Sequence, residues 1–334
     1  MAIRIGINGF GRIGKLVFIL AGVDPEIEIV HVNDRMPIDL IIYLLKYDTI
    51  RGKLDADIEG DCEHIILNEK KILVTHYDEP SLIPWYKSKA DLVLESSGKF
   101  KTRSHIEGHL TNGAKKVILS CPASDDTIDR TVVMGVNHTQ IESINKIISN
   151  SSCTTNCVAI LLKVLYEQFG VQRAFMNTVH PYTKNQNLLD GYHDDFRRSR
   201  AAANNIIPTT SSAIRTIQII MPEMKGKFDG FSTRVPVPDC SYVELIVQLG
   251  VDVSVQQVNN AFFEYSQNKL SSYLEYCADP IVSSDIKNSS YSAVFDSLST
   301  KILGNDLIQI LAWYDNEYGF SSRIIDLIKY IACL

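Results

Sequence analysis

The sequence lacks the features of a membrane protein, a repeat protein or a disordered chain. No apolar run approaches the roughly 20 residues that a membrane-spanning helix needs. Internal repeats, low-complexity tracts and long runs of like charge are also missing. The opening segment MAIRIGINGFGRIG enters a glycine motif at once, so we expect no signal peptide. These observations predict a globular, cytoplasmic protein without a membrane partner.

Cysteine is sparse and irregularly spaced. Seven cysteines among 334 residues, an odd number without a repeating spacing, do not form a disulfide framework. A reducing compartment is therefore expected. Cys153 and Cys157 lie four residues apart, but no second close pair of cysteines or histidines completes a zinc site. We expect no bound metal.

The chain also lacks a strong positive charge. A formal net charge of -6 argues against a general nucleic-acid-binding protein and favours a small-molecule partner. A local basic patch for a phosphorylated ligand remains compatible with this charge. The length of 334 residues favours two domains, each with a core of its own.

Hydrophobic patterning changes near residue 150. Before it, strand-like runs such as IRIGI, IEIVHVND and ADLVLESSG alternate with helix-like segments, which predicts an α/β domain with a parallel sheet. After it, long β-rich runs such as SYVELIVQLG and LIQILAWYD suit a mixed or antiparallel sheet. We expect one domain at 1–152, a second at 153–317, and a C-terminal helix at about 318–334 that returns to the first domain.

A dinucleotide-binding motif follows the first expected strand. GFGRIG places Gly9, Gly11 and Gly14 in the G-x-G-x-x-G spacing, between a strand and a helix. Asp34 follows about twenty residues later at the end of the next strand, as this fingerprint requires. An acid there binds ribose hydroxyls and repels the extra phosphate of NADP, so NAD is the expected cofactor. The adjacent Arg35 could partly offset that repulsion.

The segment SNSSCTTNC places Cys153 at the expected N-terminus of a helix. Free backbone N–H groups and the helix dipole would stabilise a thiolate there, which suits a nucleophile. A buried structural cysteine with hydroxyl caps has the same pattern. His180, at the end of a β-like run, could act as the base, although a lone histidine of this kind is often structural. The residues alone leave both alternatives open.

Several longer motifs resemble those of one family over nearly the whole chain. They include INGFGRIG, LLKYDT, GAKKVILS, VMGVNH, SNSSCTTNC, RRSRAAANNIIPTT, RVPVP and WYDNEYG, in order and at the family's spacing. The sequence is thereby similar to the phosphorylating glyceraldehyde-3-phosphate dehydrogenases and to their sister erythrose-4-phosphate dehydrogenases. SCTTNC and WYDNEYG are the most specific of these segments.

The resemblance implies an activity and a catalytic site. The expected reaction is NAD-dependent oxidation of D-glyceraldehyde 3-phosphate with inorganic phosphate to 1,3-bisphosphoglycerate, through a cysteine hemithioacetal and thioester. Cys153 would be the nucleophile and His180 the base. Two anion sites, for the substrate phosphate and for inorganic phosphate, would be formed by Ser152, Thr154, Thr183, Arg198, Ser211, Ser212 and Arg234.

The resemblance also implies a fold, a cofactor site and an assembly. The fold would be an N-terminal Rossmann NAD-binding domain followed by a β-rich α+β catalytic domain, in a homotetramer with the 181–205 loop beside a neighbouring subunit. Arg12 and Ile13 would lie at the pyrophosphate, and Asn316 at the nicotinamide carboxamide. The remaining expected cofactor residues are Gly9, Phe10, Gly11, Gly14, Asp34, Ser97 and Ser120.

Three positions depart from the family pattern. Ser212 stands where glycine is usual, Asn185 where related sequences often carry aspartate, and Asp78 where many carry arginine. Gly191 and Tyr192 followed by HDDFRRSR are closer to the erythrose-4-phosphate branch, whereas HPYT and WYDNEYG favour the glyceraldehyde branch. We place the three-carbon substrate ahead. A role as an NAD-binding scaffold or surface adhesin is the alternative from a different class.

Overall fold

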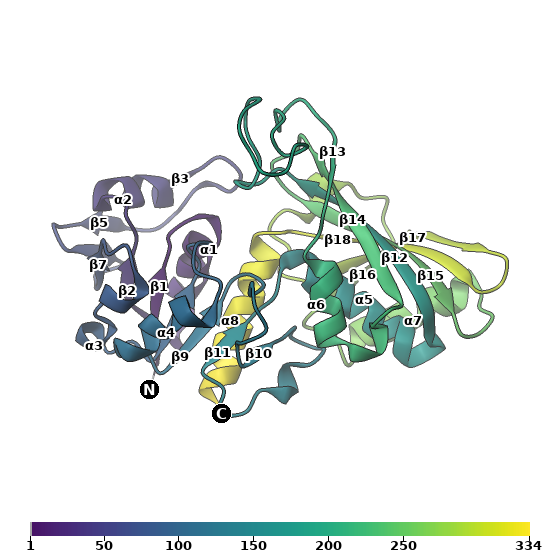
Figure 1. Cartoon of the computed structure of the whole chain (residues 1–334), viewed down its shortest axis with the longest axis horizontal. Coiled ribbons are helices and arrows are strands. Elements are labelled where there is room, and N and C mark those ends of the chain that lie inside the picture. Colours follow the sequence, from purple (N-terminus) through teal and green to yellow (C-terminus); the bar gives the residue numbers. More distant parts are fainter. Residues whose placement is uncertain (1) are drawn as a thin grey trace. The chain divides into compact units, whose positions relative to one another are not determined.

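The computed structural model of the chain describes residues 2–334 and forms two compact units (Figure 1). The first unit comprises the chain as far as Val132, then Thr139–Ser151 and Ser321–Leu334. The second comprises Val133–His138 and Ser152–Phe320. The observed boundary at Ser151 differs by one residue from the expected one. The 133–138 segment, expected in the first domain, belongs to the second unit.

The first unit is built on a nine-stranded sheet in the order β10-β11-β9-β8-β1-β2-β7-β6-β5. From β10 to β7 all neighbouring strands are parallel, and β6 and β5 continue the sheet in antiparallel pairs. A separate hairpin pairs β3 with β4. The strands are β1 (Ile3–Asn8), β2 (Ile27–Asn33), β3 (Tyr47–Asp48), β4 (Gly52–Lys53), β5 (Ile58–Gly60), β6 (His64–Leu67), β7 (Lys70–Thr75), β8 (Leu92–Glu95), β9 (Lys116–Leu119), β10 (Arg130–Thr131) and β11 (Ile147–Ser149).

The parallel strands give this unit a doubly wound topology. Reading outward from β1, β2 and β7 lie on one side and β8, β9 and β11 on the other, which is the Rossmann order. The point where the order reverses lies between β1 and β8, and ligands of such sheets bind there, beyond the carboxyl ends of the strands. The expected Rossmann domain is confirmed.

Helices of the first unit cover its sheet. They are α1 (Arg12–Gly22), α2 (Ile38–Lys46), the short α3 (Trp85–Ser88) and α4 (Arg103–Thr111), with a 3-10 turn η1 (Pro80–Leu82). Leu16, Val17 and Phe18 are buried on α1, which packs beside β2. The apolar face of α1 therefore fixes the helix, and with it the glycine turn that precedes it.

The second unit contains a mixed seven-stranded sheet in the order β13-β14-β12-β15-β18-β17-β16. β12 is parallel to β14, β16 is parallel to β17, and the other neighbours are antiparallel. The strands are β12 (Val171–Pro181), β13 (Ile207–Thr209), β14 (Phe228–Val235), β15 (Ser241–Leu249), β16 (Leu274–Cys277), β17 (Ala293–Leu303) and β18 (Leu307–Tyr314). The expected β-rich α+β domain is confirmed.

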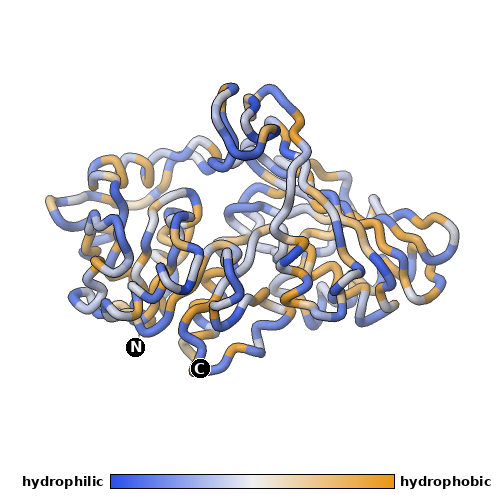
Figure 2. Tube along the Cα trace, viewed as in Figure 1, coloured by the Kyte–Doolittle hydropathy of each residue, from blue (hydrophilic) through white to orange (hydrophobic). Residues whose placement is uncertain are grey.

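The core of the second unit forms around α5 (Cys153–Phe169), which contacts β12, β15, β17 and β18. The run from Cys157 to Leu162 is fully buried, and Gly170 ends the helix with a φ of +67°. Figure 2 shows hydrophobic residues along the strands of this unit. Its other helices are α6 (Ala213–Ile220), α7 (Val255–Gln267), η3 (Pro222–Met224) and η4 (Ser283–Ile286).

The chain ends in α8 (Tyr318–Ala332), whose residues from Ser321 onward belong to the first unit. There the Lys329 ammonium lies 2.6 Å from the Asp24 carboxylate. The first turn, residues 318–320, belongs to the second unit, which differs from the expected domain division. Within residues 2–334, no helix is both long enough and apolar enough to cross a bilayer.

Candidate active site

The glycine turn between β1 and α1 has the geometry of a dinucleotide site. Gly9 has a φ of +91°, and a Cβ there would lie 2.3 Å from the Ser97 backbone nitrogen. A Cβ on Gly14 would lie 2.2 Å from the Gly9 carbonyl oxygen, whereas a Cβ on Gly11 would meet nothing within 4 Å. The first and third glycines thus permit close packing, and the second leaves space for a ligand against the backbone.

The N-terminus of α1 suits a pyrophosphate. Gly11 caps the helix and has no side chain to cover its end, so the first backbone N–H groups point toward that space. The Arg12 guanidinium binds the Asp48 carboxylate, and the Lys15 ammonium lies 3.4 Å from the same group. The contribution of Arg12 and Ile13 to phosphate binding is therefore assigned to their backbone rather than to the Arg12 side chain.

Asp34 ties the end of β2 to the glycine turn. One of its carboxylate oxygens accepts a hydrogen bond from the Phe10 backbone N–H at 2.6 Å, and the other accepts one from Met36 at 2.9 Å. Each oxygen keeps a lone pair that ribose hydroxyls can use. The neighbouring Arg35 forms an exposed ion pair with Asp78 at 3.7 Å. Asp78, a departure from the family, thus holds the cation that could offset the charge of Asp34.

In the second unit, Cys153 and His180 come together. Cys153 is the first residue of α5, and the Ser152 hydroxyl caps that helix by accepting a hydrogen bond from Thr155 at 3.1 Å. The Cys153 Sγ lies 3.5 Å from His180 Nε2. His180 is near the end of β12, and the parallel register pairs it with Arg234 on β14. The sheet therefore places a cation beside the histidine.

The other nitrogen of His180 has two competing neighbours. Nδ1 lies 2.9 Å from the Pro181 carbonyl oxygen and 2.6 Å from the Arg234 guanidinium. A carbonyl only accepts and a guanidinium only donates, so Nδ1 satisfies one of them at a time. When Nδ1–H donates to Pro181, Nε2 is unprotonated and faces the thiol. When Arg234 donates to Nδ1, the proton of the neutral imidazole is on Nε2.

Burial dominates the protonation of this pair. It raises the pKa of the Cys153 thiol to about 11, against the opposing effects of Arg234 and of hydrogen bonds from Thr154. Burial, followed by the charge of Arg234, lowers the pKa of His180 to about 3. Both shifts favour a neutral thiol beside a neutral imidazole. Burial therefore opposes the thiolate that the helix N-terminus and Arg234 favour.

Tyr314 closes the far side of this site. Its hydroxyl lies 2.9 Å from the Thr154 hydroxyl and 2.9 Å from that of Thr178, and its ring packs edge-on against His180. The Thr154 hydroxyl, expected in an anion site, is thus part of a buried hydroxyl network. Sequence reasoning missed Tyr314, although it lies within the WYDNEYG motif.

Arg198 lies against the loop that follows β13. Its guanidinium donates to the Thr209 hydroxyl at 2.8 Å and to the Thr210 hydroxyl at 3.2 Å, and it lies 3.4 Å from Asp195. A cavity beside this loop is lined by Asp195, Thr209, Thr210 and Ser211 among others. Burial, opposed by Cys153 and Tyr314 and reinforced by Arg198, lowers the pKa of Arg234. An anion bound near the Arg234 guanidinium would offset these effects and favour its charged form.

The remaining residues expected in the anion and cofactor sites make hydrogen bonds with nearby protein groups. The Ser211 hydroxyl accepts a hydrogen bond from the Ala213 backbone N–H at 3.3 Å, and Ser212 is the N-cap residue of α6, with a φ of -66°. This φ is ordinary for any residue, so the departure from glycine introduces no backbone strain. Thr183 follows β12 and accepts a hydrogen bond from the exposed Asn185. Asn316 accepts one from the Ser241 hydroxyl at 3.0 Å.

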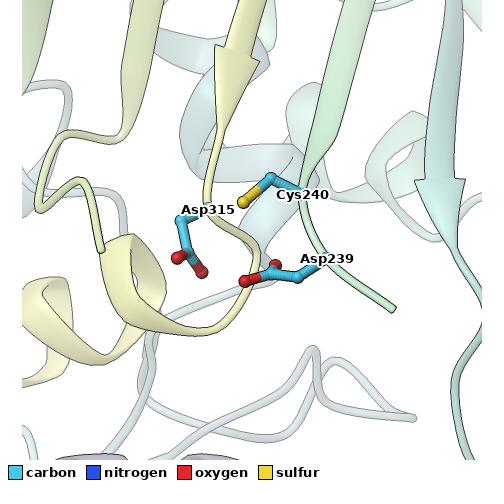
Figure 3. A group of neighbouring side chains, drawn as sticks. All are labelled: Asp239, Cys240 and Asp315. Atoms are coloured by element: carbon cyan, nitrogen blue, oxygen red, sulfur yellow. The ribbon is translucent and has the colours of Figure 1, made fainter. Parts of the chain in front are cut away.

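One cluster outside this site brings possible metal ligands together. Ligand atoms of Asp239, Cys240 and Asp315 lie within 4.8 Å of one another (Figure 3). The Asp315 carboxylate, however, accepts hydrogen bonds from the backbone N–H groups of Asn288, Glu317 and Tyr318 at 2.8 to 3.0 Å. Those bonds fix the turn before α8, and we assign no metal to the cluster.

Comparison with known proteins identifies the family. Residues 3–103 match the glyceraldehyde 3-phosphate dehydrogenase NAD binding domain, and residues 152–316 match the C-terminal domain of the same family. A glyceraldehyde-3-phosphate dehydrogenase of Priestia megaterium is 44% identical over 333 residues, which cover 99% of each chain. The chain belongs to the glyceraldehyde-3-phosphate dehydrogenase family. The expected family and its NAD cofactor are thereby confirmed.

Other members of the glyceraldehyde-3-phosphate dehydrogenase family show similar agreement. Glyceraldehyde-3-phosphate dehydrogenase 2 of Streptomyces avermitilis is 46% identical over 333 residues, with 99% of each chain covered. The Mycobacterium leprae enzyme is 44% identical over 335 residues, with 98% of each chain covered. The likeness therefore extends over both units and is not confined to the nucleotide-binding motif.

Proposed function

We propose that this chain oxidises D-glyceraldehyde 3-phosphate with NAD and inorganic phosphate to 1,3-bisphosphoglycerate, a step of glycolysis and gluconeogenesis. The observation that carries the proposal is the 3.5 Å contact between the Cys153 thiol and His180 Nε2, with Arg234 beside the same imidazole. A nucleophile, a base and an anion-binding cation converge there, in a member of the glyceraldehyde-3-phosphate dehydrogenase family.

Covalent catalysis begins at Cys153. Its sulfur attacks the aldehyde carbon while His180 Nε2 accepts the thiol proton and returns it to the developing alkoxide, which gives a hemithioacetal. His180 then accepts the hydroxyl proton as hydride leaves the same carbon, and a thioester remains. A phosphate oxygen then attacks the thioester carbonyl, the C–S bond breaks and the acyl phosphate forms. The leaving Cys153 sulfur takes back the proton from His180, which restores the thiol and the neutral imidazole. Bound NAD supplies the hydride acceptor.

Arg234 links anion binding to the base. While its guanidinium donates to His180 Nδ1, Nε2 carries the imidazole proton and cannot accept another. An anion that takes this N–H leaves Nδ1–H to donate to Pro181, and Nε2 becomes the acceptor. Phosphate binding therefore favours the tautomer that the proposed mechanism needs.

The chain's own residues hold the cofactor in the first unit. The backbone of the 9–14 turn and the start of α1 would take the pyrophosphate, and Asp34 would take the adenosine ribose. The fit rests on the open space at Gly11 and on carboxylate lone pairs of Asp34. Phe10 supports Asp34 through its backbone N–H, and Ser97 and Ser120 lie at the ends of neighbouring strands.

One assay separates the substrate candidates. NADH formation is measured with D-glyceraldehyde 3-phosphate and with D-erythrose 4-phosphate, each with and without inorganic phosphate. We expect the higher kcat/KM for the three-carbon sugar and a strict need for phosphate. A higher kcat/KM for the four-carbon sugar would assign the erythrose-4-phosphate activity. NAD binding without turnover of either sugar would favour a scaffold or adhesin.

Replacing Arg198 or Arg234 by leucine is expected to raise KM for the aldehyde phosphate, for inorganic phosphate, or for both. A charge-assisted hydrogen bond to phosphate is worth about 1.5–3 kcal/mol, so tenfold or larger effects are expected. Arg200→Leu is the matched control, because Arg200 is exposed and pairs with Asp190. Unchanged KM values in both variants would refute the assignment of the anion sites.

Asp34→Ala is expected to narrow the preference for NAD over NADP. The change removes a charge that repels the ribose phosphate, but Asp78 still holds Arg35. The double variant Asp34→Ala with Asp78→Ala should narrow the preference for NAD further, since Arg35 can then pair with the ribose phosphate of NADP. The measurement is kcat/KM for each cofactor, with Asp39→Ala, an exposed acid on α2, as control. Equal use of both cofactors by the unmodified protein would disprove this reading.

We further propose that the protein is a cytoplasmic homotetramer. All seven cysteines are free, which fits a reducing compartment. The 181–205 loop exposes large apolar side chains, with Leu189 at 79%, Tyr192 at 92% and Phe196 at 87% exposure. Side chains of this kind favour burial against another subunit. Sedimentation equilibrium that gives the mass of one chain would refute the assembly.

A further inference from the structure

A row of polar residues crosses the first unit at the carboxyl edge of its parallel strands. Glu95, Asn8, Asn33 and Thr75 are the last residues of β8, β1, β2 and β7, and the register pairs each with the next. Neighbours in register point to the same face of a sheet. Asn33 donates to Asn8 at 2.9 Å, and Thr75 donates to Asn33 at 2.8 Å. Glu95 is the charged member of this row.

Glu95 is deeply buried and receives four hydrogen bonds. Only 1% of the residue is exposed. One carboxylate oxygen accepts from Asn8 Nδ2 at 2.5 Å and from His109 Nε2 at 3.0 Å. The other accepts from the backbone N–H of Ser97 at 2.8 Å and from its hydroxyl. Four donor groups therefore surround this carboxylate, and a buried acid is best accommodated where such donors satisfy its oxygens.

His109 has its tautomer fixed by Trp85. The indole Nε1–H can only donate, and it lies 2.9 Å from His109 Nδ1. Nδ1 is then the acceptor, and the imidazole proton is on Nε2, where it faces Glu95. His109 is fully buried, so water does not compete for this hydrogen bond. The histidine is thus a built-in donor to the carboxylate.

Glu95 also holds both serines that the sequence analysis assigned to the cofactor. Its carboxylate binds Ser97, and its backbone carbonyl accepts the N–H of Ser120 at 3.0 Å and the Ser120 hydroxyl at 3.1 Å. Ser97 in turn lies against Gly9 of the nucleotide turn. One residue therefore fixes two serines at the point of the sheet where a dinucleotide binds.

This arrangement determines whether the hydroxyl groups of Ser97 and Ser120 donate or accept hydrogen bonds. A hydroxyl has one proton, and both serines donate theirs toward Glu95. The Ser97 oxygen accepts one bond from the Lys99 backbone at 3.1 Å and keeps one lone pair. Ser97 is exposed and Ser120 is half-buried, so a ligand can reach both oxygens. Such a ligand meets acceptors, which suit hydroxyl or amide donors and not phosphate.

We propose that Glu95, supported by His109, is a positioning residue of the NAD site that presents Ser97 and Ser120 as acceptors for hydroxyl or amide donors of the cofactor. The inference rests on the proposed function, because it takes NAD to be the ligand of this site. Glu95 acts through the serines and does not contact the cofactor itself.

The first test compares Glu95→Gln with the unmodified full-length protein by calorimetric titration with NAD. The glutamine nitrogen only donates, so whichever carboxylate oxygen it replaces, it faces two donors, either the Ser97 N–H and hydroxyl or the side chains of Asn8 and His109. The hydrogen bonds that hold Ser97 are then lost directly or weakened as the carboxamide shifts. The dissociation constant for NAD is expected to rise about tenfold, as for loss of one hydrogen bond to a charged group. KM for the aldehyde phosphate should stay constant, since its proposed ligands belong to the second unit.

A double-mutant cycle separates positioning from general structure. Ser97→Ala should weaken NAD binding in the unmodified protein and have little further effect in the Glu95→Gln background. Additive effects, or an unchanged dissociation constant in Glu95→Gln, would overturn the inference while leaving the proposed function intact. Failure of the unmodified protein to bind NAD would overturn both.

His109 provides a second pair of variants in case Glu95→Gln does not fold. His109→Gln keeps an N–H donor, whereas His109→Met keeps only the bulk. We expect His109→Gln to keep the NAD affinity of the unmodified protein and His109→Met to weaken NAD binding. Equal NAD affinity in these two variants would contradict the role of His109. His64→Gln is the control in the same unit, since the His64 side chain contacts Asp61 and lies outside the hydrogen bonds that join Glu95, His109 and the polar row.

Discussion

Cys153→Ser is expected to abolish dehydrogenase turnover while NAD binding stays measurable. A serine hydroxyl at the start of α5 is a much poorer nucleophile at neutral pH, even with His180 Nε2 at 3.5 Å from the replaced sulfur. The loss in kcat should be on the order of 10⁴-fold or more, as for removal of a catalytic nucleophile. The measurement is NADH formation, with calorimetric titration for NAD.

Cys157→Ser is the matched control for this prediction. Cys157 lies one turn further along α5 and is fully buried in the core of the second unit. The Cys157→Ser variant should retain substantial dehydrogenase activity, with some loss of thermal stability because a hydroxyl is buried in the core. Near-normal turnover in Cys153→Ser would rule out this cysteine as the nucleophile.

His180→Asn is the second change with a large expected effect. Asparagine has no basic nitrogen, so the thiol proton loses its acceptor, and kcat should fall by roughly 10²–10⁴, as for a lost general base. Loss of the imidazole should also move iodoacetamide alkylation of this thiol to higher pH, because the basic nitrogen 3.5 Å from the sulfur, which can take its proton, is then missing. Stopped-flow NADH formation and alkylation rates against pH are the two measurements.

The control for His180→Asn is His138→Asn in the same unit. His138 is half-buried and accepts a hydrogen bond from Gly135 at 3.1 Å, and it is not one of the proposed catalytic or anion-binding residues. It should change neither kcat nor the alkylation profile. If the alkylation profile of His180→Asn matches that of the unmodified protein, His180 does not activate the thiol, and Arg234 with the helix terminus must account for its reactivity.

The nucleotide turn could be predicted because its requirements are local. Gly9 needs a positive φ, Gly11 needs open space and Gly14 needs close backbone packing, and each requirement shows as a glycine at a fixed spacing. Asp34 lies at the end of the next strand, so the same short segment includes it. A short segment of sequence was therefore enough to predict both the Rossmann fold of the first unit and a dinucleotide as its ligand.

The hydrogen-bonding of that site was not predictable. Neither Glu95, which follows the apolar residues 92–94, nor His109 was singled out from the sequence. Their contact joins β8 to α4, and Trp85 on α3 decides which nitrogen of His109 donates. No spacing along the chain encodes a pairing between three separate elements.

By itself, the sequence determined the two-domain organisation and the glycine turn with Asp34, and it singled out Cys153 and His180 as the candidate reactive pair, because short motifs and strand periods express these locally. Only the tertiary structure decided which groups surround Cys153 and His180 and how these groups shift their protonation. The register of β12 against β14 brings Arg234 to within 2.6 Å of His180 Nδ1 across 54 positions of chain. Burial then opposes the thiolate that the helix terminus favours, since desolvation depends on everything packed around the sulfur.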